Sequence, residues 1–285
     1  MHRSINLSPK SIAQWLCRIS SSLSSTWRPF PLTISLAILL TICNSLPSQT
    51  CYFDESLQGM VNADIQFIQK LEINEAQLQD MMNGNAQAIM NSVVYTIPVV
   101  FHVIHLGESV GTGSNISDAQ LMQALDDLNY DFRDIGGAGT DVEIEFCLAQ
   151  RAPDGSPSTG INRVNGYGVG DYESIGMATG GNETALKALS IWPNRDYLNI
   201  WVVYDIIGGF GMAPPNGFAT LPGAPSNVDG IVLRADATGV SSYSHVITHE
   251  VGHFFALYHT FEGSVGSTCA PNTDCHLQGD RICDT

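Results

Sequence analysis

Basic residues are scarce in this sequence. The 285 residues include 12 Lys and Arg against 28 Asp and Glu, a formal net charge of −16. Four of the basic residues precede residue 30 and the first acidic residue is Asp54, so residues 51–285 keep eight basic and 28 acidic residues, or −20. This acidic balance argues against nucleic acid as a partner. It suits a soluble extracellular protein and would favour basic substrates.

The sequence lacks a clear membrane span. Residues 32–43 read L-T-I-S-L-A-I-L-L-T-I-C, an apolar run of about a dozen residues, whereas a spanning helix needs about 20. The run follows a basic stretch and precedes small and polar residues, as in a secretory signal peptide. No A-x-A cleavage site is present, and we expect cleavage between Cys43 and Cys51. Residues 1–50 are therefore predicted to be a signal peptide with a long n-region. We accordingly expect secretion and no stable membrane association. A retained signal anchor is the alternative.

No pair of cysteines has the C-x-x-C spacing of a structural zinc site, which argues against a second metal site. Loss of residues 1–50 would leave an odd number of cysteines in an exported protein, where some should pair. The sequence predicts at least one local disulfide among the last three, without assigning partners. The remaining cysteines are Cys51, Cys147, Cys269, Cys275 and Cys283.

The most informative stretch is 249–259, which reads H-E-V-G-H-F-F-A-L-Y-H. Residues four apart on a helix lie on one face, so His249 and His253 can bind one metal ion through their imidazoles. Glu250 lies beside them and can reach a water on that metal, as the general base of the H-E-x-x-H arrangement. The alternative is a helix with chance histidines.

His259 strengthens the metal interpretation. It lies six residues after His253, so a straight helix would carry it away from the metal. The helix must end near Ala256 and the chain must turn back. Three neutral histidines and a water then give a four-coordinate zinc with an open position, the pattern of catalytic sites.

These residues resemble the metzincin metalloproteases, whose pattern is H-E-x-x-H-x-x-G-x-x-H. The text H-E-V-G-H-F-F-A-L-Y-H-T-F-E-G is similar to the pappalysin and cytophagalysin branch. That family has Gly or Asn at the turn, where this chain has Ala256. A left-handed backbone at Ala costs roughly 1 kcal/mol. The site is therefore either slightly strained but functional, which we favour, or weakened in metal affinity.

The remaining sequence predicts an α/β (α+β) fold. Dense β-branched and aromatic residues or alternation predict strands at 93–106, 142–150, 197–205 and 229–234, with a short edge strand within 217–222. Helices are predicted at 117–133, with Ser117 as N-cap, at 183–189, and at 242–255. The segment between 160 and 181 is interpreted as a Gly-rich loop. The resemblance runs from about residue 94 to the end and implies a metzincin-like catalytic domain: a twisted mixed five-stranded sheet with a backing helix and an active-site helix.

The two ends of the chain carry further expectations. Residues 51–92 are polar, with helices expected near 63–71 and 75–88 and no strong core signal, and are interpreted as a propeptide or N-terminal extension. Some metzincin propeptides cap the zinc with a cysteine, for which Cys51 is a candidate. Metzincins also have a methionine-containing turn after the third histidine, but no methionine follows His259. Residues 93–285 are therefore predicted to be a C-terminally truncated metalloprotease domain, with its C-terminal subdomain largely missing.

The resemblance implies a secreted zinc endopeptidase that hydrolyses peptides or proteins. Glu250 would be the catalytic base, and His249, His253 and His259 the Zn²⁺ ligands. The edge strand near 218–221 would bind the substrate backbone by strand addition. The alternative is a catalytically inactive peptide-binding or adhesion module with the same fold. Some relatives bind Ca²⁺, and four carboxylates after the third histidine could be its oxygen ligands. The alternative is that these carboxylates are only surface charges. These are Glu262, Asp274, Asp280 and Asp284.

Overall fold

The computed structural model describes residues 53–63, 65–83, 93–207, 215–264, 268–269, 273–275 and 278–282. The chain divides into two compact units, and residues 49–258 make up the larger one. The fold described here is that of the larger unit. None of the described helices is both long enough and apolar enough to cross a membrane.

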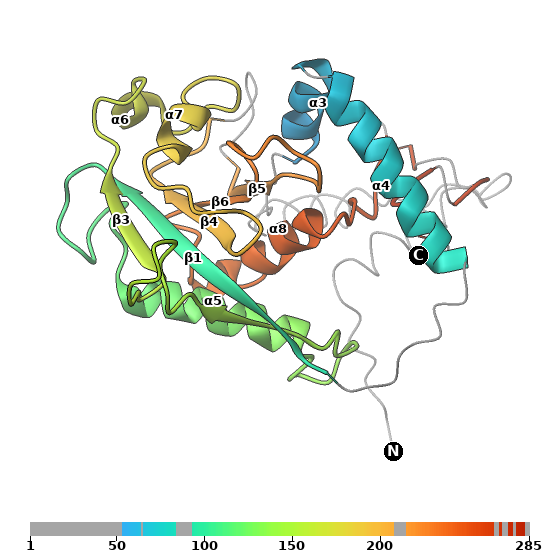
Figure 1. Ribbon diagram of the computed structural model, residues 1–285, viewed down its shortest axis with the longest axis horizontal. Helices are drawn as coiled ribbons and strands as arrows, with labels where there is room; N and C mark the ends of the chain where they lie inside the picture. The colour runs from blue at the N-terminus through green and yellow to red at the C-terminus, as the bar shows by residue number, and fades with distance from the viewer. Residues whose placement is uncertain are drawn as a thin grey trace, which may run out of the picture. The chain divides into compact units, whose positions relative to one another are not determined.

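A single mixed sheet forms the centre of this unit (Figure 1). Its spatial order is β2-β1-β4-β6-β5, and β3 continues along the β2 side of β1. All neighbouring pairs are parallel except β5 with β6, which is antiparallel. The strands are β1 (Tyr95–His105), β2 (Ile144–Leu148), β3 (Ile161–Asn165), β4 (Leu198–Val203), β5 (Gly217–Ala219) and β6 (Ile231–Arg234).

Helices cover both faces of the sheet, as Figure 1 shows. On one face, α5 (Asp118–Phe132) and α8 (Val246–Phe254) pack onto the larger apolar cluster. On the other face, α6 (Tyr172–Ile175) and α7 (Glu183–Lys187) pack around Trp201. Every residue of β4 is buried, as expected for a parallel strand covered on both sides. The predicted fold class is confirmed.

The prediction of Ser117 as a helix cap is confirmed, because its side chain accepts a hydrogen bond from the backbone N–H of Gln120. The active-site helix was predicted to run through 242–255. It is divided instead into a 3₁₀ turn, η1 (Ser241–Tyr243), and α8. The four predicted long strands and the short edge strand are all present, with shorter bounds.

The interpretation of 160–181 as a loop was wrong in part, because this segment contains β3 and α6 and gives the sheet a sixth strand. The residues of β3, I-N-R-V-N, are mostly half-buried and show no clear alternation. Their strand conformation is stabilised by parallel pairing with Phe101–His105 of β1, which is a tertiary interaction that local sequence does not encode.

The N-terminal segment differs from its prediction in helix bounds and in burial. Its helices are α3 (Phe53–Ala63) and α4 (Ile65–Asn83), rather than separate helices at 63–71 and 75–88. Residues 84–88 lie outside the described residues. The segment also has core residues that the sequence did not indicate, since Phe53 and Phe67 are buried.

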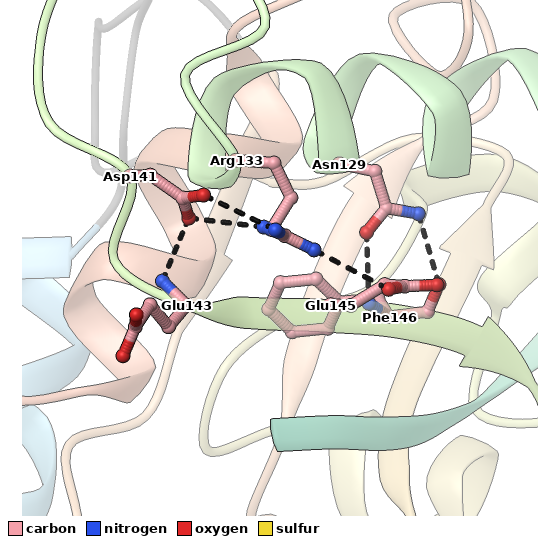
Figure 2. A network of polar contacts seen from close by, with 6 residues as sticks. All are labelled: Asn129, Arg133, Asp141, Glu143, Glu145 and Phe146. Carbon is pink, nitrogen blue, oxygen red and sulfur yellow. Dashed lines mark hydrogen bonds and ion pairs between the residues drawn. The ribbon is translucent and has the colours of Figure 1, made fainter. Parts of the chain in front are cut away.

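Side chains from α5 hold the β2 edge of the sheet (Figure 2). The Asn129 amide donates to the Phe146 carbonyl at 2.9 Å and accepts from the Phe146 N–H at 2.8 Å. Beside it, the Arg133 guanidinium donates to both Asp141 carboxylate oxygens, at 2.9 and 3.1 Å. These hydrogen bonds lower the pKa of Asp141 below its usual value.

His102, on β1, has a structural role. Its Nε2 lies 2.8 Å from the Asn199 side-chain oxygen, and its ring stacks on Trp201. The side chain is fully buried, and this burial lowers its pKa from 6.5 to about 4, so the imidazole is neutral at physiological pH.

Candidate metal centre and active site

The candidate site is built on α8, which carries His249, Glu250 and His253. The four-residue spacing brings the two histidines together, with their Nε2 atoms 3.0 Å apart and their rings nearly perpendicular. Two imidazole nitrogens bound to one tetrahedral zinc, each at about 2.1 Å, lie roughly 3.4 Å apart. The observed separation is close to this value, so the pair fits a shared metal ion.

A backbone carbonyl fixes the orientation of the His253 ring. The Nδ1 atom of His253 lies 2.6 Å from the Leu257 carbonyl oxygen. Because a carbonyl can only accept, Nδ1 carries the proton and Nε2 keeps its lone pair. This is the arrangement in which a second hydrogen bond orients a metal-binding imidazole.

The turn predicted at Ala256 is confirmed. The helix ends at Phe254, and Ala256 has a positive φ of 70°. The Ala256 N–H donates to the His253 carbonyl at 2.8 Å, and the Leu257 N–H donates to the Gly252 carbonyl at 2.9 Å. These two bonds define a Schellman motif, with alanine in the position that glycine usually occupies. The same turn places the Leu257 carbonyl beside His253.

The third histidine completes a group that could hold a metal ion. One potential ligand atom from each of His249, His253 and His259 lies within 4.8 Å of the others. All three are imidazoles, which suit zinc, and His253 and His259 are buried. The donor set therefore fits the zinc that the sequence predicts.

Glu250 is 1% exposed and lies between α8 and the edge strand β5. A Cβ atom built onto Gly217 would lie 3.0 Å from the Glu250 Cγ, so the glutamate side chain passes directly over this glycine. Sequence reasoning missed this role of Gly217, because the contact arises only when α8 packs on the sheet. The glycine leaves room for the carboxylate beside the strand.

The strand β5 presents part of its backbone away from the sheet. The carbonyl of Asn216 and the N–H of Thr220 bond to β6, and Phe218 pairs with Val232. Because an antiparallel strand alternates its hydrogen-bonding direction, the backbone N–H and C=O groups of Gly217 and Ala219 point away from β6. These groups have the geometry that strand addition by a peptide requires.

The other predicted site residues have less support. Among the described residues, the three histidines form the one group of potential ligands, so the carboxylates of Glu262, Asp274 and Asp280 give no support for Ca²⁺. Asp284 and Cys51 lie outside the described residues. Cys147 is a free thiol, whereas Cys269 and Cys275 are disulfide-bonded. Their pairing stays a prediction.

Comparison with known proteins agrees with this geometry. A peptidase family model described as pregnancy-associated plasma protein-A matches residues 182–285. The chain resembles the pappalysin metalloproteases. An extracellular metalloprotease of Colletotrichum graminicola is 30% identical over 213 residues, which cover 73% of this chain and 63% of the relative. One of Pyricularia oryzae is 27% identical over 220 residues, which cover 74% and 62%. The chain thus spans a little under two thirds of these curated relatives.

Solved structures of mirolysin from Tannerella forsythia share the fold. Mature mirolysin in complex with a cleaved peptide is 28% identical, with a TM-score of 0.51 and coverage of 67% of this chain and 71% of that one. A promirolysin variant is 26% identical, with a TM-score of 0.53 and coverage of 81% and 76%. The predicted resemblance to metzincin-type metalloproteases is therefore confirmed.

Proposed function

We propose that the chain is a secreted zinc-dependent endopeptidase. The observation that carries the proposal is the pair of imidazoles on α8, with Nε2 atoms 3.0 Å apart, beside a glutamate that lies against the edge strand. The similarity to proteins named metalloproteases supports a metal-dependent protease.

Three side chains would hold the zinc ion: His249, His253 and His259. When bound, zinc would polarise the carbonyl of the scissile peptide and lower the pKa of the attacking water. The Leu257 carbonyl keeps His253 in the tautomer that can bind the metal. The Schellman turn at Ala256 maintains that carbonyl position.

Glu250 would be the catalytic base. In support, its side chain is buried and lies over Gly217 of β5, the strand in which backbone groups of Gly217 and Ala219 point away from β6. A peptide that paired with this strand would run past the carboxylate, which would accept a proton from the attacking water. The substrate class is therefore an extended peptide or an exposed protein segment.

We further propose the domain assignment made from the sequence. Residues 1–50 would be a signal peptide, 51–92 an N-terminal extension or propeptide, and 93–285 the metalloprotease domain. Secretion is supported by the relatives, which are named extracellular metalloproteases. Nucleic acid is not an expected partner of a chain with this acidic balance. The non-catalytic binding module is less favoured because Glu250 is present and buried at the site.

A single substitution tests the proposal. Glu250→Ala should keep the zinc bound to the chain but lower peptide cleavage by at least about 100-fold, the scale of general base catalysis. Zinc content after dialysis and cleavage of a fluorogenic peptide library would be measured together. Glu145→Ala removes an exposed carboxylate on β2 and serves as the matched control.

Two outcomes would contradict the proposal. Equal cleavage by the parent chain and the Glu250→Ala variant would show that this carboxylate is not the base. Stoichiometric zinc without cleavage of any library peptide, both before and after proteolytic removal of residues 51–92, would favour the non-catalytic binding module.

A further inference from the structure

Phe53, at the start of α3, lies in an aromatic pocket that belongs to the candidate site. Its side chain is fully buried. The ring stacks flat on the His253 imidazole, with centroids 3.8 Å apart and an interplanar angle of 7°. The Tyr258 ring meets it edge-on at 6.1 Å. The walls of this pocket are therefore a predicted metal ligand and a residue just beyond the helix turn.

The rest of the N-terminal segment is held around the edge strand. Helix α3 contacts β5, and α4 reaches the loop that follows it (Figure 1). The Asn74 side-chain amide donates to the Pro222 carbonyl at 2.8 Å. A Cβ atom on Gly223 would lie 3.2 Å from the Cβ of Lys70, so α4 and the loop after β5 approach each other closely. Helix α3 thus lies against the strand on which a peptide would be bound, and α4 lies against the loop that follows it.

We propose that the pocket of Phe53 is a binding subsite for an aromatic side chain of the peptide substrate, and that Phe53 fills it as an internal ligand. The inference rests on the proposed function. A side chain on the face of the His253 imidazole would lie one ring away from the metal. It would therefore come from a residue close to the scissile bond of a peptide paired with β5.

The shape of the pocket favours a planar, uncharged group. The flat stack on His253 and the edge-on contact with Tyr258 both suit an aromatic ring, whose faces are electron-rich and whose edges are positive. An imidazole bound to zinc shares part of the positive charge of the metal, so stacking of a guanidinium there would be repulsive. An aliphatic side chain would gain burial but no ring stacking.

The test measures binding rather than turnover. The full chain, loaded with zinc and carrying Glu250→Ala to prevent cleavage, would be mixed with four labelled peptides that differ only in one residue: Phe, Leu, Ala or Arg. The further substitution Phe53→Ala should empty the pocket and tighten binding of the Phe peptide by roughly 10- to 100-fold, the scale of fully burying such a ring. The Ala peptide should gain less than about threefold. Ile73→Ala, which truncates an exposed residue of α4, is the matched control.

The outcomes separate this inference from the proposed function. An equal gain for the Phe and Ala peptides, or a larger gain for the Arg peptide, would overturn the aromatic subsite. Aromatic preference in binding, without cleavage by the Phe53→Ala chain that retains Glu250, would leave the subsite standing and overturn the endopeptidase proposal. Cleavage without aromatic preference would do the reverse.

A second variant keeps the test decisive if Phe53→Ala fails to fold. Phe53→Leu retains an apolar side chain and should give an intermediate gain for the Phe peptide. A folded Phe53→Leu chain with unchanged affinity for that peptide would contradict the proposal.

Discussion

At the β2 edge of the sheet, the Asn129 side chain bonds to both backbone groups of Phe146. At the β5 edge, the backbone groups of Gly217 and Ala219 point away from β6, and helix α3 contacts the strand. Both strands are short and both terminate the same sheet. One edge is closed by a side chain of the helix behind it. The other is contacted by α3, a separate segment of the chain.

This difference has a physical basis. An exposed strand edge is a template for pairing with any extended chain, and proteins commonly block it. Asn129 blocks the outward backbone groups of Phe146, and Arg133 pairs with Asp141 just before β2 (Figure 2). At the β5 edge, the contact comes from α3 of the N-terminal segment, whose Phe53 lies on His253. A segment that can move away would leave the strand free for a peptide, in line with the proposal that β5 binds the substrate.

The largest expected effect is a loss of zinc affinity at the candidate metal site beside β5. His253→Ala removes one of the two imidazoles on α8 and the ring on which Phe53 stacks. Zinc affinity should fall by at least about 100-fold, since loss of a mere supporting contact costs 10–100-fold. Competition with a chromophoric chelator measures the affinity.

His105→Ala is the matched control, because His105 lies at the end of β1 outside the group of three histidines. Undiminished zinc in His253→Ala, or an equal loss in the control, would show that the metal site is elsewhere.

The second prediction concerns the stability of the sheet between the two edges, through the buried His102 of β1. His102 has a pKa of about 4 when folded and about 6.5 when unfolded. Between these values the unfolded chain binds the extra proton, so stability is fully present above pH 6.5 and is lost as the pH falls toward 4. The expected loss is about 3 kcal/mol in the free energy of unfolding. Urea denaturation at pH 7 and pH 4.5, with a chelator present, measures it.

His102→Gln keeps a donor for Asn199 but does not titrate. Its stability should therefore fall less between the two pH values than that of the parent chain. An identical loss in both chains would mean that His102 is not the group responsible.

The third prediction perturbs the closed edge alone. Asn129→Ala leaves the N–H and C=O of Phe146 without their side-chain partner, which should lower the free energy of unfolding by about 2 kcal/mol. Zinc affinity should not change. Gln123→Ala, an exposed residue of the same helix that bonds to Asp127, should change stability by less than about 0.5 kcal/mol. If the two variants are equally stable, the amide does not close this edge.

The sequence predicted those features whose cause is local. The N-cap at Ser117, the apolar stripe of α5 and the dense strand residues of β1 and β4 are signals within a few residues. The turn near Ala256 followed from the spacing of the histidines, because no straight helix could bring the third one back, and its left-handed backbone followed from the resemblance, whose members have Gly or Asn there.

The features that were missed depend on contacts between distant segments. β3 is stabilised by its pairing with β1 rather than by its own pattern. Phe53 carries no periodic core signal in its segment, and its role emerges only when α3 is placed beside His253. The Leu257 carbonyl could have been found, since a left-handed residue at Ala256 predicts a Schellman motif that turns the following residue back to the helix.

The smallest expected effect concerns the turn at Ala256, which follows the metal-binding helix α8. Ala256 adopts φ 70°, where a Cβ atom is unfavourable, and glycine would remove a penalty of about 1 kcal/mol. Ala256→Gly should therefore raise the free energy of unfolding slightly and keep the Leu257 carbonyl against His253. Zinc affinity should be equal or higher, measured by chelator competition beside a urea titration. Gly59→Ala is the opposite control, because Gly59 lies in α3 with open space around it, and alanine should stabilise that helix. Marked loss of zinc in Ala256→Gly would show that the alanine side chain itself, and not the backbone turn, supports the metal site.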